Sequence, residues 1–191
     1  MLEKLPHAIG HALQGIQPGL EATVYHGGDV ATAPEIIRVT SSGFADGQPM
    51  PARYTEDGER VSPPLAWTGV PADAQAVVLL IEDPDSPTPH PYVHAIVWDL
   101  PGRDGELPEA GLKSKGAPGE PHGLGKNSQL GAEYLPPDPP TGHGPHRYLF
   151  QVYALSRQPK LSGHPGRTAL LDAMRGHVIA KGCLTGLYER P

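Results

Sequence analysis

Three segments with the character of β-strands constrain the fold most strongly. Residues 76–81 form a continuous apolar run, and residues 92–98 and 146–155 are two further segments of strand character. A continuous apolar run bounded by turn residues is typical of a strand buried on both faces. No convincing helix separates these segments. We therefore predict a mainly β, antiparallel fold with peripheral helices rather than alternating strands and helices.

The rest of the chain gives weaker signals. Residues 36–40 and 183–188 are strand candidates, and apolar residues on one side of 168–180, including Leu170, Met174 and Val178, predict a helix. The chain has 24 glycines and 24 prolines with no fixed period, which indicates many ordered turns. Residues 101–145 contain little apolar periodicity, and a loop of this length in a domain is usually functional or disordered.

The N-terminal region differs from the rest. Apolar positions spaced three and four apart predict a helix over residues 5–16. We assign residues 1–35 to an N-terminal helical extension and residues 36–191 to a single domain. The apolar stripe of the helix also suggests a homodimer formed through residues 1–20.

Charge and composition exclude several classes of protein. The net charge is −6 with no long basic run, so the electrostatic attraction that drives nucleic-acid binding has no evident source. No segment approaches the roughly 18 apolar residues of a membrane helix. The single cysteine, Cys183, excludes an internal disulfide. The interrupted apolar residues at the N-terminus do not resemble a signal peptide, and we expect a cytoplasmic protein.

Three polar clusters lie beside the strongest strands. Asp83 and Asp85 follow the run 76–81, His94 lies within the second strand, and His146 begins the third. Each alone has a simple structural interpretation: a solvated turn, a core histidine, and a histidine at the rim of an aromatic strand face. Strand alternation places His94 on one face with Tyr92, Ile96 and Trp98. The same alternation places Tyr148 with His146 and turns Arg147 away from both.

The combination of clusters is more specific than its parts. The chain reads DPDSP at 83–87, then a strand with His94, then GHGPHRY at 142–148 and VYAL at 152–155, with SPPLAW at 62–67 and GLYER at 186–190. These segments resemble the signature regions of the phosphatidylethanolamine-binding protein family, in particular its bacterial Raf-kinase-inhibitor-like branch. The likeness runs from about residue 36 to the C-terminus.

The resemblance implies a central antiparallel sheet, a smaller second sheet and peripheral helices. It also implies a binding or regulatory protein without catalytic residues, metal or cofactor, whose small surface pocket takes phosphate-type anions or phospholipid head groups. Kinase or protease inhibition is described for relatives, and no partner protein is indicated here. Carried over by position, the pocket consists of Asp83, Asp85, Tyr92, His94, Asp138, Pro139, Pro140, His146 and Tyr148.

The charges of such a pocket are mixed. Histidines and the Tyr148 hydroxyl can donate to an anion, whereas the aspartates repel it. Anion affinity should therefore change between about pH 5.5 and 7.5, where histidines titrate. The loop 134–140 reads YLPPDPP, so prolines replace glycines of the family pattern and Asp138 adds negative charge. Val93 also precedes His94 where relatives have an aromatic residue.

Two alternatives remain open at this point. Asp83, His94 and His146 could serve as acid, base and orienting group of a hydrolase of small phosphates or esters, although the chain lacks a Gly-x-Ser-x-Gly nucleophile motif. His94, His146 and a carboxylate are also a reasonable zinc ligand set, although the histidines lack the close spacing of common zinc motifs.

Overall fold

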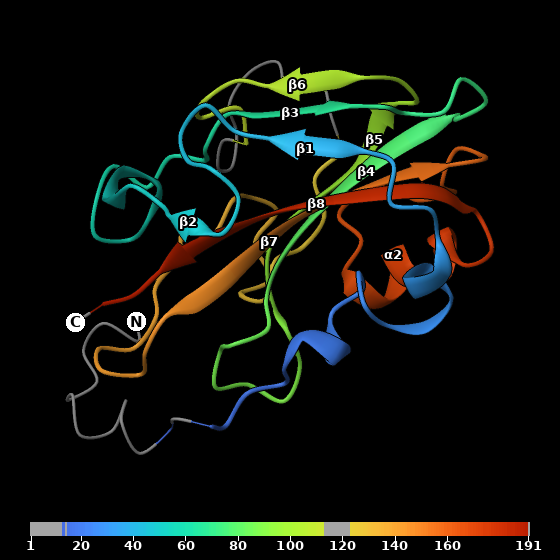
Figure 1. The fold of residues 1–191 in the computed structure, drawn as a ribbon. Coiled ribbons are helices and arrows are strands. Elements are labelled where there is room, and N and C mark those ends of the chain that lie inside the picture. Colours follow the sequence, from blue (N-terminus) through green and yellow to red (C-terminus); the bar gives the residue numbers. More distant parts are fainter. Residues whose placement is uncertain (1–12, 14, 113–122, 191) are drawn as a thin grey trace.

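A computed structural model describes residues 13, 15–112 and 123–190, and it has three layers (Figure 1). A five-stranded sheet with the order β2-β8-β7-β4-β5 lies in the middle, and a three-stranded sheet with the order β1-β3-β6 covers one face. Helix α2 and residues 20–32, which we call the N-terminal segment, lie on the other face. The prediction of a mainly β fold with a smaller second sheet and peripheral helices is confirmed.

The elements have the following bounds. The strands are β1 (Arg38–Thr40), β2 (Gln48–Pro49), β3 (Leu65–Thr68), β4 (Ala76–Asp83), β5 (Tyr92–Pro101), β6 (Gly105–Leu107), β7 (His146–Leu155) and β8 (Val178–Tyr188). The helices are α2 (Arg167–Met174) and the short 3₁₀ helices η2 (Leu20–Ala22), η3 (Gly28–Thr32) and η4 (Ala52–Tyr54). In the described ranges, no helix is long and apolar enough to cross a membrane.

The central position of β4 in the sheet explains why every residue from 76 to 81 is apolar. It pairs antiparallel with both β5 and β7, and its residues are buried along the whole strand. Val77, Leu79 and Ile81 face the core between the two sheets. Val78 and Leu80 face a second core under α2 and the N-terminal segment. A strand with a core on each face has no side exposed to water, so it shows no polar alternation.

The helix predicted over residues 168–180 is wrong in its C-terminal part. Helix α2 ends at Met174, and the chain turns at Gly176, which has a φ of 70° that favours glycine. Val178 already belongs to β8, where it pairs with Leu155 of β7. The same apolar residues fit either a helix or a strand. Pairing with β7 decides for the strand and outweighs the helical spacing of the residues around Val178.

The described residues of the N-terminal region pack against the same domain. The helix predicted over 5–16 and the homodimer through 1–20 fall mostly outside the described residues. Downstream, Val24, Tyr25 and Val30 are buried in the second core against β7 and α2. The domain boundary near residue 35 stays a prediction, and the described residues from 15 to 35 contain 3₁₀ turns.

Candidate functional site

The C-terminal end of β4 and the N-terminal ends of β5 and β7 meet at one edge of the large sheet. In the antiparallel register, Asp83 lies opposite Tyr92 of β5, and its neighbour Glu82 lies opposite Leu149 of β7. Asp83 thereby reaches the first residue of β7, and its Oδ2 lies 2.7 Å from Nδ1 of His146. Both side chains are almost completely buried. The structure therefore brings together two residues that lie 63 positions apart in the chain.

A second histidine extends this pair. Nε2 of His146 lies 2.8 Å from Nδ1 of His143, and Nε2 of His143 lies 3.1 Å from the backbone oxygen of Leu13. His143 is positioned by a turn in which its backbone N–H donates to the oxygen of Pro140. His143 is not among the predicted site residues, although the spacing His143-x-x-His146 is visible in the sequence. We call Asp83, His146 and His143 the histidine chain.

Asp85 belongs to the same edge but is held by a different partner. Its carboxylate accepts hydrogen bonds from the backbone N–H and the guanidinium of Arg147, whose Nε lies 2.8 Å away. Hydrogen bonding to Asp85 raises the pKa of Arg147. Asp83 in turn accepts the backbone N–H of Asp85 at 2.8 Å. Arg147 therefore compensates the charge of Asp85, whereas the carboxylate of Asp83 interacts with His146.

A β-bulge sets the direction of His94. Ile81 pairs with Ala95 and Glu82 pairs with Val93, so the register skips His94. A bulge changes the face to which a side chain points. The prediction that His94 shares a face with Ile96 is therefore wrong: His94 contacts Tyr148, with ring centroids 5.1 Å apart, while Ile96 packs in the core on the opposite side.

His94 and Tyr148 each carry a buried polar atom without a partner. Nδ1 of His94 lies 2.7 Å from the backbone oxygen of Leu135, so this nitrogen carries the proton. Burial lowers the pKa of His94, which favours the neutral ring with Nε2 as an acceptor. Burial raises the pKa of Tyr148, which keeps the hydroxyl protonated. Within the described residues, neither His94 Nε2 nor the Tyr148 hydroxyl has a hydrogen-bond partner.

The remaining predicted residues line the same region. The ring of Tyr92 lies 5.5 Å from that of His94. Arg190, which belongs to the GLYER segment but is not among the predicted site residues, donates to Asp138 at 2.8 Å and to the backbone oxygen of Pro139 at 2.8 Å. This arginine fixes the proline-rich loop and compensates the charge of Asp138. Pro140 is buried and accepts the N–H of His143.

The geometry bears on the two alternatives. In the described ranges, no three histidine, cysteine, aspartate or glutamate side chains cluster in a way that could hold a metal ion, so the zinc alternative has no support there. A hydrolase of this type would also need a nucleophile, and the serine beside the aspartates is Ser86. Its hydroxyl lies 3.3 Å from the backbone oxygen of Asp83 and 2.7 Å from Thr88 Oγ1. It is thus bonded within its own turn rather than to a histidine of the site.

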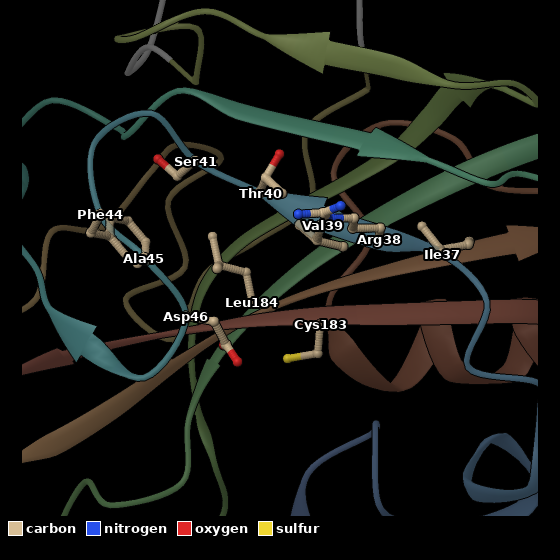
Figure 2. Close-up of a pocket in the computed structure, with 10 residues that line it drawn as sticks. All are labelled: Ile37, Arg38, Val39, Thr40, Ser41, Phe44, Ala45, Asp46, Cys183 and Leu184. Atoms are coloured by element: carbon tan, nitrogen blue, oxygen red, sulfur yellow. The ribbon is translucent and has the colours of Figure 1, made fainter.

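Two surface hollows lie away from these residues. One, of about 450 Å³, lies between β1, the loop after it and β8, with Arg38, Asp46 and Cys183 in its walls (Figure 2). Burial raises the pKa of Cys183 to about 12, which makes its thiol a poor nucleophile. Another, of about 530 Å³, is lined in part by Glu56, Arg60 and Leu135. The histidine chain, His94 and Tyr148 line neither hollow and are closed off from solvent.

Comparison with known proteins places the chain in a family. The family model described as phosphatidylethanolamine-binding protein matches residues 40–189. The chain belongs to the phosphatidylethanolamine-binding protein family. The resemblance predicted from the signature segments is therefore confirmed.

Individual relatives agree with this assignment. A UPF0098 protein of Methanothermobacter thermautotrophicus is 36% identical over 81% of this chain and 99% of its own length. Among solved structures, the homologue CT736 of Chlamydia trachomatis has 34% identity and a TM-score of 0.73, over 82% of this chain and 99% of that one. Escherichia coli YbcL, a member of the same family, has 25% identity and a TM-score of 0.75 over the same shares. The family model does not include residues 1–39.

Proposed function

We propose that this protein binds a small phosphate-type anion or a phospholipid head group at the site formed by His94, Tyr148 and the histidine chain. The observation that carries the proposal is the pair of neighbouring buried polar atoms without partners, His94 Nε2 and the Tyr148 hydroxyl. Leaving such an atom unpaired costs about 1–3 kcal/mol of folding free energy. Unpaired polar atoms of this kind are typical of sites at which a ligand or an ordered water supplies the missing hydrogen bonds.

The protonation states narrow the chemistry of the ligand. A neutral His94 with its proton on Nδ1 offers an acceptor at Nε2, so the ligand atom facing it must donate. The Tyr148 hydroxyl can donate to a ligand oxygen beside it. A phosphate that keeps one hydroxyl meets both demands, and so does a head group that brings an ammonium as well as a phosphate. This differs from the expectation that His94 itself donates to an anion.

The charges of the site fit a ligand of low net charge. Asp85 and Asp138 are compensated by Arg147 and Arg190, whereas Asp83 faces the site through the histidine chain. A fully ionised phosphate would meet the field of Asp83 and a histidine lone pair. A protonated phosphate, or a zwitterion with an ammonium near Asp83, avoids this repulsion.

Replacing Tyr148 by Phe tests the proposal. The change removes only the unpaired hydroxyl, so the free protein should be as stable as the wild type or more stable. Binding of inorganic phosphate and of phosphoethanolamine, measured by calorimetry at neutral pH, should weaken by about tenfold because one hydrogen bond to a charged group is lost. Acetate serves as the comparison anion without a phosphoryl group.

Tyr153→Phe is the matched control. The Tyr153 hydroxyl lies on the opposite face of the sheet and donates to Gln151 Oε1 at 2.5 Å. Its loss should destabilise the fold, because the Oε1 atom of buried Gln151 loses its donor while Nε2 keeps its bond to Glu82, and should not change ligand affinity. Equal affinity of wild type and Tyr148→Phe for every anion, or no binding by the wild type, would refute the proposed site.

A further inference from the structure

The segment before η2 contacts the site at His143. Residues 13 and 15–19, which we call the latch segment, pass beside the loop between β4 and β5 (Figure 1). The N–H of Gly19 donates to the oxygen of Pro84, which lies between the two aspartates of the DPD sequence. The oxygen of Leu13 accepts from Nε2 of His143. The latch segment thus contacts both signature regions, although it lies outside the residues that the family model matches.

The chain after the latch segment is firmly anchored. The N–H of Val24 donates to Oε2 of buried Glu82, and Nε of Arg167 lies 2.6 Å from Oε1 of the same carboxylate. Buried Lys181 donates to the backbone oxygens of Tyr25 and Ala31, each at 2.9 Å. An anchored neighbour keeps the latch segment at high effective concentration beside the site. In the described residues, two hydrogen bonds hold it beside the site, from Gly19 to Pro84 and from His143 to Leu13, so it can open without unfolding of the domain.

The hydrogen bonds of the histidine chain require one extra proton when the latch segment is docked. Both ends of the chain are acceptors, namely the Asp83 carboxylate and the Leu13 oxygen. Three hydrogen bonds along the chain then need three protons, whereas two neutral imidazoles carry only two. The third proton resides on a histidine or on Asp83. When Leu13 leaves, water can donate to His143, and two neutral histidines can both point their protons toward Asp83.

We propose that the latch segment closes the site in a proton-dependent manner, docking when the histidine chain holds one extra proton and opening when that proton is lost. This inference rests on the proposed function for its consequence, because an open latch would admit the ligand. The closed state agrees with the burial of Asp83, His146 and Tyr148 from solvent.

The other charged groups near the chain do not supply this proton dependence. The groups facing it are Asp85 and Arg147, Asp138 and Arg190, His94, and Tyr148. Each carboxylate is paired with the arginine named beside it. Burial lowers the pKa of His94 and raises that of Tyr148, so burial favours the uncharged form of both side chains.

Hydrogen exchange of the Gly19 amide in the full chain measures docking without any ligand. Protection of this amide, corrected for the intrinsic exchange rate and recorded between about pH 5 and 8, should fall by up to tenfold per pH unit as the pH rises. The sign follows from linkage, since the docked state binds one proton more than the open state. Protection that is flat or rises over this range would overturn the inference.

Two variants separate the latch from the site. His143→Leu removes the donor to Leu13, so Gly19 should lose protection at every pH and the pH dependence should vanish. Gly19→Ala leaves the histidine chain intact: the added Cβ meets nothing within 4 Å, but φ at this position is 79°, which disfavours alanine. Protection of residue 19 should fall about threefold to tenfold while its pH dependence persists.

The control is His164→Leu. It removes another bond between a histidine and a backbone oxygen, from His164 Nδ1 to Leu124 at 2.8 Å, and should leave Gly19 unchanged. Amides of β4 and β7, such as those of Leu80 and Phe150, report whether each variant is folded. Loss of Gly19 protection in the control, or full protection in His143→Leu with a folded core, would contradict the latch.

Phosphate affinity distinguishes failure of the latch from failure of the proposed function. Inorganic phosphate keeps at least one hydroxyl throughout this pH range, and it should bind Gly19→Ala threefold to tenfold more tightly than the wild type, the same factor by which the latch is weakened. A pH-dependent Gly19 amide without phosphate binding would uphold the latch and refute the ligand. Equal phosphate binding by both proteins would refute the latch as a closure of the site.

Discussion

At the scale of single residues, the end of β4 shows how strand alternation divides two acidic side chains between two tasks. Glu82 points into the second core, where it accepts from Val24, Gln151 and Arg167. Asp83 points to the other face and meets His146. Adjacent carboxylates of the same strand end therefore hold the N-terminal segment on one face and form the site on the other.

His94 provides the prediction at this scale. Burial lowers its pKa, and its Nδ1 faces the Leu135 oxygen, so we expect a neutral ring with the proton on Nδ1. In ¹⁵N NMR spectra, Nε2 of His94 should show the shift of an unprotonated nitrogen at about pH 6.5, where an exposed histidine is half protonated. Because the unfolded chain takes up this proton more readily, the associated stability is present above about pH 6.5 and is lost as the pH falls.

The result that would contradict this prediction is a protonated Nε2 resonance at the same pH. It would mean that His94 can donate to an anion, and the ligand would then need an acceptor at that position. His94→Gln is a useful companion variant, because the amide offers either a donor or an acceptor.

At the scale of elements, the crossing of the 34–37 segment over β8 depends on Gly182. The N–H of Ile37 donates to the oxygen of Lys181, and the N–H of Lys181 donates to the oxygen of Pro34. A Cβ at position 182 would lie 1.9 Å from the backbone oxygen of Ile37. The two segments can approach this closely only because residue 182 has no side chain.

Gly182→Ala should therefore push the 34–37 segment away from β8. We expect a loss of about 1–3 kcal/mol in the free energy of unfolding, measured with urea, and faster exchange of the Ile37 amide. Gly166→Ala is the control, since no atom lies within 4 Å of its added Cβ. Its cost should stay below about 1 kcal/mol, the penalty of alanine at a helix N-cap. Equal costs of the two changes would show that the contact at Gly182 relaxes freely.

At the scale of the whole molecule, buried tyrosines make the free energy of unfolding depend on pH in the alkaline range. Burial raises the pKa of Tyr134, Tyr148 and Tyr153 far above the ordinary value of 10.0. Below about pH 10 these phenols are protonated in both folded and unfolded chains. Above it, only the unfolded chain ionises them freely, so stability falls as the pH rises.

We expect unfolding and tyrosine ionisation to occur together in one steep transition. Each of the three tyrosines removes about 1.4 kcal/mol of stability per pH unit above about pH 10, which makes roughly 4 kcal/mol per unit in total. Absorbance at the phenolate band and circular dichroism, recorded on the same samples, should change at the same pH. Ionisation of all tyrosines in a protein that keeps its native dichroism would contradict this.

The sequence by itself determined the central strands, the mainly β fold and the family. Residues 76–81, 92–98 and 146–155 contain enough aliphatic and aromatic residues to specify strands locally, and the signature segments beside them indicate the site region around Asp83, His94 and His146. These features lie in short stretches of chain, where periodicity and turn chemistry act directly.

The tertiary structure decided the features that depend on register. The β-bulge that turns His94 toward Tyr148, the extension of Asp83–His146 to His143, and the end of α2 at Met174 each follow from how distant strands pair. The anchoring of Arg190 and Lys181 likewise depends on partners more than 50 positions away in the chain. A local sequence pattern does not reveal partners so far apart in the chain, because burial and hydrogen bonding of these side chains are set only when the whole sheet has formed.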